Sequence, residues 1–136
     1  MARNDTEFKY WKFVFPGRIP SKKNSTRRIK RGNRVFTVPS EAHEAWEEEM
    51  LWNLKSQERP EEPFQKCSCL VGFYVPDRRV ADLTNKTESI MDVMVKAGII
   101  KDDNWFCVGS LDLRFYGVDK QNPRCEVYIL KGPKDE

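Results

Sequence analysis

The chain has 136 residues, a length that suits one domain able to bury its own core. It is 39% hydrophobic and 33% charged, which is typical of a globular protein and excludes a disordered chain. No apolar run approaches the roughly 20 residues that a membrane span needs, and the first seven residues lack the apolar core of a signal peptide. We therefore expect a single domain over residues 1–136, cytoplasmic and without a membrane partner, with frayed ends at 1–6 and 131–136.

The formal net charge of +3 conceals an uneven distribution. Residues 41–62 are rich in glutamate, whereas residues 18–34 contain no acidic side chain. The basic residues of this earlier segment are Arg18, Lys22, Lys23, Arg27, Arg28, Lys30, Arg31 and Arg34. A segment of this kind suits a protein that holds a polyanion on one side only.

The first half of the chain predicts three strands and a helix. The aromatic run at 8–15 predicts a strand that Pro16-Gly17 ends. Two short basic runs, 27–30 and 34–37, flank a glycine and predict an exposed hairpin. Ser40 is a suitable N-cap for a helix that runs to about residue 55. Its apolar stripe is formed by Ala42, Trp46, Met50 and Leu54.

The second half predicts three more strands and a second helix. Residues 67–75 are strongly apolar and are expected in the centre of the sheet. The second helix is predicted over 86–97, with Asn85 as its N-cap and Glu88 at the N3 position of a capping box. Strands are predicted at 105–116 and 126–130. The order β-β-β-α-β-α-β-β indicates one α+β domain, with a mixed, mostly antiparallel sheet that carries two helices.

The four cysteines are expected to be buried free thiols. Cys67 and Cys69 alternate along one predicted strand and should point to the same face. A zinc site needs four ligands at suitable spacing, and the single histidine, His43, is far from the cysteines in sequence.

Acidic and amide side chains flank the second predicted helix. Asp82, Asn85 and Glu88 stand at its start, and Asp102-Asp103-Asn104 follows its end. Carboxylates that converge commonly share a divalent metal ion, because hard cations such as Mg²⁺ take oxygen ligands. The helix carries the chain about 18 Å away, and residues 98–103 can return about 20 Å when nearly extended, so convergence is feasible but taut. Beside the basic segment, these acids indicate phosphodiester chemistry on nucleic acid.

Each of these residues also has a purely structural interpretation. Glu88 completes a capping box, and Asn85 serves as a cap. Asp82 favours the positive end of a helix, and the acidic pair belongs to an ordinary polar turn. The aromatic pair Trp105-Phe106 is predicted to lie in the core rather than to stack on bases. The arrangement as a whole is more specific than any single member.

Motifs along most of the chain agree in order, spacing and residue type with one known family. They are Pro20-Ser21-Lys22-Lys23-Asn24, Val38-Pro39-Ser40, Asp77-Arg78-Arg79 through Asp82-Leu83-Thr84-Asn85, Ile90-Met91-Asp92, Lys96-Ala97-Gly98-Ile99-Ile100 and Asp102-Asp103. With these motifs the chain resembles the RusA family of Holliday junction resolvases, small endodeoxyribonucleases common in prophages.

The resemblance implies a homodimer that hydrolyses phosphodiesters at four-way DNA junctions in recombination and repair, with Mg²⁺ or Mn²⁺ bound by aspartates. Asp82 matches the first catalytic aspartate, Asp103 matches the last one, and Asn85 matches the asparagine after the motif. Branched DNA is the implied partner. The expected DNA-binding residues are Lys22, Lys23, Asn24, Arg27, Arg28, Lys30, Arg31, Arg34, Arg78 and Arg79.

The chain departs from the family pattern at two positions. Thr84 stands where the best-known members have a second aspartate, and Glu88 stands where they have a functional lysine. Our hypothesis is that Glu88 replaces the missing carboxylate, so that Asp82, Glu88 and Asp103 hold the metal with Asp102 beside them. Lys86, or Lys22 and Lys23, then supplies the positive charge. This interpretation predicts a metal-dependent endodeoxyribonuclease that resolves Holliday junctions. The alternatives are a branched-DNA-binding protein that has lost cleavage and a less selective nuclease for branched DNA.

Overall fold

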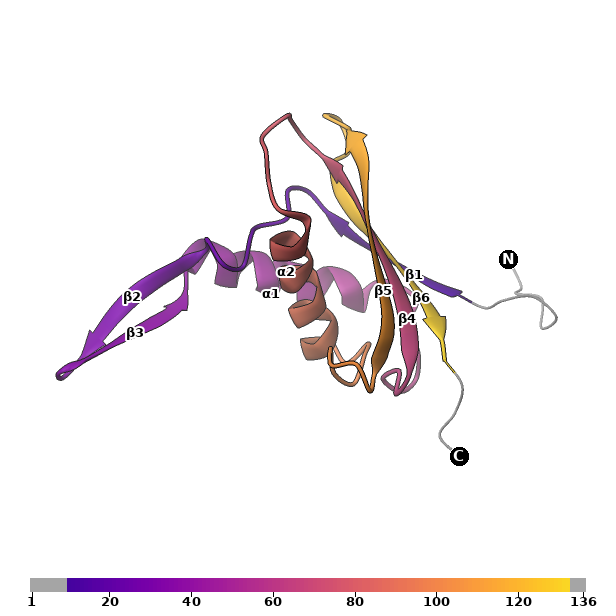
Figure 1. Cartoon of the computed structure of the whole chain (residues 1–136), viewed down its shortest axis with the longest axis horizontal. Coiled ribbons are helices and arrows are strands. Elements are labelled where there is room, and N and C mark those ends of the chain that lie inside the picture. The colour runs from indigo at the N-terminus through magenta and orange to yellow at the C-terminus, as the bar shows by residue number, and fades with distance from the viewer. Residues whose placement is uncertain (1–9, 133–136) are drawn as a thin grey trace.

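The structure is a computed structural model and describes residues 10–132 (Figure 1). Its elements follow the order that the sequence predicts. They are β1 (Tyr10–Pro16), β2 (Thr26–Arg31), β3 (Arg34–Pro39), α1 (Glu41–Lys55), β4 (Cys67–Val75), α2 (Leu83–Lys96), β5 (Val108–Val118) and β6 (Arg124–Lys131). The predicted α+β class with two helices is confirmed.

The main sheet has four strands in the order β1-β6-β4-β5. β6 runs antiparallel to both β1 and β4, whereas β4 and β5 are parallel. The parallel pair is joined through α2, because parallel strands need a long crossover connection. The apolar strand 67–75 therefore lies inside the sheet, as predicted, and the sheet is mixed and mostly antiparallel.

Both helices lie on one side of this sheet (Figure 1). Every second residue of the inner strands points toward them, as the period of a strand requires. The largest fully buried side chains are Phe13, Phe15, Met50, Leu54, Ile90, Met94, Ile99, Ile100, Ile129, Val71, Val93 and Val127. This packing fixes α2 on the sheet and so positions the acidic residues that the helix carries.

The N-terminus of α1 is capped as predicted, because the Ser40 side chain accepts a hydrogen bond from the backbone N–H of His43 at 3.0 Å. Met50 and Leu54 of the expected apolar stripe are buried. Ala42 is exposed, and His43 takes its place on the buried side. The stripe therefore begins with a three-residue step, which a helix of 3.6 residues per turn allows equally well.

The predicted start of α2 is wrong by three residues. Its N-cap is Asp82, whose carboxylate accepts a hydrogen bond from the backbone N–H of Thr84 at 3.0 Å. Aspartate and asparagine cap helices about equally well, so the chain holds two cap-like residues within one turn and the earlier one is used. Asn85 consequently occupies N3. Glu88 lies in the second turn and completes no capping box.

The hairpin of β2 and β3 forms a separate two-stranded sheet that projects from the body (Figure 1). Its turn contains Gly32 at a φ of +62°, a left-handed conformation that glycine adopts without strain. Ile29 faces Phe36 across the strands, and Phe36 is exposed. The predicted exposed basic hairpin is confirmed.

The start of β5 also differs from the prediction. The strand begins at Val108, and Trp105 and Phe106 are 80% and 79% exposed instead of lying in the core. Asn104 is the reason, because its backbone carbonyl and its side chain both accept hydrogen bonds from the residues that follow and form a turn there. Cys107 and Val108 enter the core instead.

The end of the described chain is better ordered than predicted. Lys131 is the last residue of β6, and the backbone N–H of Gly132 donates to the carbonyl of Lys66 at 2.7 Å. The remaining predicted frayed residues, 1–6 and 133–136, lie outside the described residues. All four cysteines are buried and free, as predicted, and no helix in residues 10–132 is long and apolar enough to cross a membrane.

Candidate nuclease site

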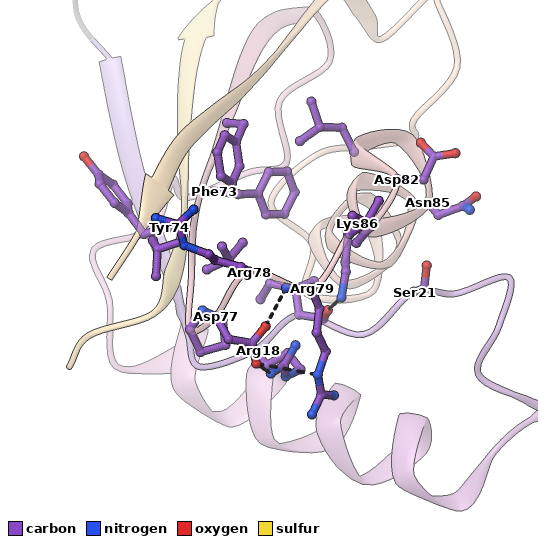
Figure 2. Close-up of a pocket in the computed structure, with 18 of the residues that line it drawn as sticks. Arg18, Ser21, Phe73, Tyr74, Asp77, Arg78, Arg79, Asp82, Asn85 and Lys86 are labelled. Atoms are coloured by element: carbon purple, nitrogen blue, oxygen red, sulfur yellow. Dashed lines mark hydrogen bonds and ion pairs between the residues drawn. The ribbon is translucent and has the colours of Figure 1, made fainter. Parts of the chain in front are cut away.

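A cleft of about 1210 Å³ lies where the end of β4, the loop that follows it and the start of α2 meet the beginning of the basic segment (Figure 2). The predicted site residues that line it are Asn24, Arg78, Arg79, Asp82, Asn85 and Lys86. Asp82 and Asn85 are one helical turn apart at the N-terminus of α2 and lie close together in Figure 2. The cleft therefore combines acidic, amide and basic groups from distant parts of the chain.

Asp82 is held in one orientation by Thr84. One carboxylate oxygen of Asp82 accepts from the Thr84 hydroxyl at 2.7 Å and from the Thr84 backbone N–H at 3.0 Å. These hydrogen bonds, together with the positive charge of Lys23, lower the pKa of Asp82. The exposed carboxylate is therefore ionised at neutral pH. Thr84, at the position where the family pattern has an aspartate, orients this carboxylate and adds no charge.

Lys86 and Ser89 attach the beginning of the basic segment to α2. The Lys86 ammonium donates to the carbonyl of Ile19, and the Ser89 hydroxyl donates to the carbonyl of Pro20 at 2.8 Å. Burial, and to a smaller extent the charge of Arg18, lower the pKa of Lys86. The structure thus gives Lys86 a positioning contact that its sequence pattern did not reveal.

The loop after β4 is fastened at Asp77. The carboxylate of Asp77 accepts from the guanidinium of Arg18 and from the backbone N–H of Arg79, the latter at 3.0 Å (Figure 2). The Arg18 contact is the main reason why the pKa of Asp77 is lowered. Asp77 therefore ties the basic segment to the loop, while the side chains of Arg78 and Arg79 remain exposed.

Further along α2, Lys22 lies among three carboxylates. Its ammonium is 2.6 Å from the carboxylate of Asp92. The hydrogen bond to Asp92 is the main factor that raises the pKa of Lys22, and the nearby charges of Glu88 and Asp103 add to it. Sequence reasoning missed Asp92 as a site residue. Its signal was the four-residue spacing from Glu88, which places both on one helix face.

The two aspartates after α2 have different surroundings. Asp102 accepts from the backbone N–H of Asp103 at 2.8 Å and from the Asn104 side chain at 3.0 Å, so both of its oxygens serve the turn. Partial burial, then the proximity of Asp102 and Asp92, raise the pKa of Asp103. Asp103 is therefore the member of the pair that joins the acidic group of α2.

The acids form two groups in this structure: Asp82 in the cleft, and Glu88, Asp92 and Asp103 around Lys22. Among residues 10–132, no three acidic, cysteine or histidine side chains are placed to hold one metal ion together. The predicted set Asp82, Glu88 and Asp103 is therefore not brought to metal-binding distance. Its carboxylate oxygens do have the donor chemistry that Mg²⁺ or Mn²⁺ requires.

In the basic hairpin one arginine forms ion pairs with α1, and the other cations point into solvent. Arg27 contacts Glu41 at 3.0 Å and Glu44 at 3.8 Å and so fastens the hairpin to α1. The other cations of the hairpin are exposed and form no ion pair within the described part of the chain. They are Arg28, Lys30, Arg31 and Arg34.

Comparison with known proteins gives the family. Residues 16–130 match the family model described as endodeoxyribonuclease RusA, a range from the last residue of β1 to near the end of β6. The chain is also 31% identical over 91 residues to the crossover junction endodeoxyribonuclease RusA of Aquifex aeolicus (strain VF5). That alignment covers 67% of this chain and 71% of the relative. The chain therefore belongs to the RusA family of endodeoxyribonucleases.

Proposed function

We propose that this RusA-family endodeoxyribonuclease resolves four-way DNA junctions by metal-dependent hydrolysis of phosphodiesters. The metal ligands in this proposal are Asp82, Glu88 and Asp103. One observation carries it: Lys22, from the segment suited to phosphate binding, contacts Asp92 of α2 and lies near the charges of Glu88 and Asp103. Phosphate-binding charge and two of the three proposed metal ligands, Glu88 and Asp103, thus lie together, while Asp82 lies in the cleft.

In the proposed chemistry the metal would activate water, and the basic side chains of the protein bind the DNA. A bound Mg²⁺ or Mn²⁺ lowers the pKa of water and stabilises charge on the phosphate oxygens. The exposed cations of the hairpin and the arginines after β4 attract the DNA backbone, largely without regard to sequence. In the free protein Lys22 pairs with Asp92 at 2.6 Å, and the charges of Glu88 and Asp103 also act on its ammonium.

Thr84 and Glu88 account for the unusual acid pattern within this proposal. Thr84 orients Asp82 through its hydroxyl and brings no second charge. Glu88 supplies a carboxylate on the same helix face as Asn85 and Asp92. The number of acidic groups is thereby kept while one of them moves by about a turn. Asp92 is a further oxygen donor for the metal or for Lys22.

The proposal includes a homodimer bound to branched DNA. A closed dimer has two-fold symmetry, which matches paired cuts in opposing strands of a four-way junction. Each protomer then places one acidic group beside one strand. Size-exclusion chromatography with light scattering measures the oligomeric state directly.

The decisive experiment measures cleavage of a synthetic four-way junction in Mg²⁺, with duplex and flap DNA as controls. We expect symmetric paired cuts that Asp82→Asn, Glu88→Gln and Asp103→Asn each abolish. Glu48→Gln, an exposed glutamate of α1, is the matched control and should cut normally. Tight junction binding without cleavage in Mg²⁺ or Mn²⁺ would show a DNA-binding protein that has lost its chemistry. Equal cleavage of flaps and junctions would show a less selective nuclease.

A further inference from the structure

Two large aromatic side chains stand in solvent directly after the acidic turn. Trp105 is 80% exposed and Phe106 is 79% exposed, and their ring centroids are 6.2 Å apart in an edge-on arrangement. Adjacent exposed aromatics of this size are uncommon on a folded domain, because burying them is strongly favourable. Neither ring contributes to the core, so the pair is available to bind a partner.

The backbone that carries this aromatic pair is fixed by hydrogen bonds. The Asn104 side chain accepts from the N–H groups of Phe106 at 3.0 Å and Cys107 at 3.3 Å, and its amide donates to Asp102. Buried Cys107 then donates through its thiol to the carbonyl of Phe64 at 3.2 Å. The turn is therefore tied at both ends. A preorganised surface loses little conformational entropy when it binds.

The aromatic pair is also next to the acidic group that the proposed chemistry uses. Asp103, two residues before Trp105, lies close to Asp92 and Lys22: the charge of Asp92 helps to raise the pKa of Asp103, and the charge of Asp103 helps to raise the pKa of Lys22. A second copy of the chain is a poor occupant for this surface. A two-fold contact there would bring the Asp102-Asp103 turn toward its own copy, and like charges repel. The DNA backbone is negative too, but Lys22 and the exposed cations of the hairpin and of the loop after β4 offset its repulsion from these acids, and a second copy brings these cations together as well.

We propose that Trp105 and Phe106 stack on nucleobases exposed at the branch point of the DNA substrate. A duplex that ends at a branch has a terminal base pair without a stacking neighbour on one side. Stacking on aromatic side chains tolerates any base, because every base has a π face. The aromatic pair thus recognises branch structure without reading sequence. This inference rests on the proposed junction-resolving function.

The test compares Trp105→Ala with Trp52→Ala. Trp52 is another exposed tryptophan, 66% exposed on α1, where the ammonium of Lys55 covers its ring. Binding of a labelled four-way junction is measured in EDTA, with a relaxed, covalently closed circular duplex as a competitor that has no ends. We expect Trp105→Ala to weaken junction binding about 10-fold and circular duplex binding less than about 2-fold. Trp105→Phe should retain most of the affinity, and Trp52→Ala should bind like the wild type.

Salt dependence separates stacking from charge. Trp105→Ala removes no cation, so the slope of log K against log salt should stay unchanged while the affinity falls at every salt concentration. An unchanged junction affinity, or an equal loss for junction and circular duplex, would refute stacking at the branch. A variant that becomes monomeric while the wild type is dimeric would identify a self-association surface instead. If the wild type binds the junction but does not cut it, the proposed function fails and the stacking result still stands.

Discussion

Asp82 has two roles that substitution can separate. It caps α2 through its hydrogen bond from the backbone N–H of Thr84, and in our proposal it binds the metal. Loss of an N-cap side chain costs about 1 kcal/mol, so Asp82→Ala should lower the free energy of unfolding by that amount. For a domain of this size the melting temperature should fall by about 3–5 °C. Asp82→Asn keeps a side-chain oxygen acceptor and should stay within about 0.5 kcal/mol of the wild type.

The same two variants should behave alike in cleavage. Both remove the carboxylate, so both should lose junction cutting in Mg²⁺, whatever their stability. Urea unfolding followed by circular dichroism gives the free energy, and labelled four-way junctions give the cutting rate. Ser40→Ala is the matched control, because it removes the cap of α1, far along the chain from the cleft residues of α2. It should lose about 1 kcal/mol and cut at the wild-type rate.

Two results would refute this reasoning. If Asp82→Asn were as unstable as Asp82→Ala, the side chain would not cap the helix as the structure indicates. If Asp82→Asn cut junctions at the wild-type rate, Asp82 would hold no metal, and the acidic group around Lys22 would have to act without it.

Three further changes test other parts of the structure. Glu126→Gln should lower stability at pH 7 by about 1–2 kcal/mol, because the buried Glu126 accepts a hydrogen bond from Arg124 at 2.9 Å. Burial alone would raise the pKa of Glu126, but Arg124 and its other partners lower it. The stabilisation from Glu126 is therefore present above the unfolded pKa of about 4.3. In acid unfolding measurements it should disappear as the pH falls through the folded pKa. The double substitution Arg28→Ala with Arg31→Ala should reduce the slope of log K for junction binding against log salt by about 2 in a titration series. It should leave the free energy of urea unfolding within about 0.5 kcal/mol of the wild type, because both residues are exposed. An unchanged slope would show that the hairpin does not contact phosphate. Ser89→Ala should lower the free energy of urea unfolding by about 1–2 kcal/mol and slow junction cutting, since it leaves the carbonyl of Pro20 without its donor. Cutting at the wild-type rate would show that this hydrogen bond has no influence on the site.

The sequence predicted the fold well where local rules and burial agree. A strongly apolar run identified β4, and a serine before an amphipathic run identified the start of α1. It failed where two local signals compete within a few residues. Asp82 and Asn85 both suit an N-cap, and only the path of the chain selects the first. Trp105 belongs by composition to a buried strand, but the hydrogen bonds of Asn104 delay that strand by three residues.

The candidate site was predictable as a set of residues and not as a geometry. Spacing on one helix suffices to place Glu88 and Asp92 on a common face. The position of Lys22 beside these carboxylates depends on contacts between residues about 70 positions apart. The ammonium of Lys86 and the hydroxyl of Ser89 hold the backbone just before Lys22. Such contacts arise from packing of the whole domain, which no local pattern encodes.

Lys22 also explains how the free protein tolerates its acidic group. Glu88, Asp92 and Asp103 lie near one another, and like charges at this spacing destabilise a fold. The ammonium of Lys22 compensates these negative charges from a segment that is fixed at Ile19 and Pro20. The hairpin that follows has no core of its own, and its ion pair with Glu41 is made by Arg27, near the start of β2. The basic segment thus has a beginning that is fixed beside the carboxylates and a projecting hairpin whose exposed cations, in our proposal, bind the DNA backbone.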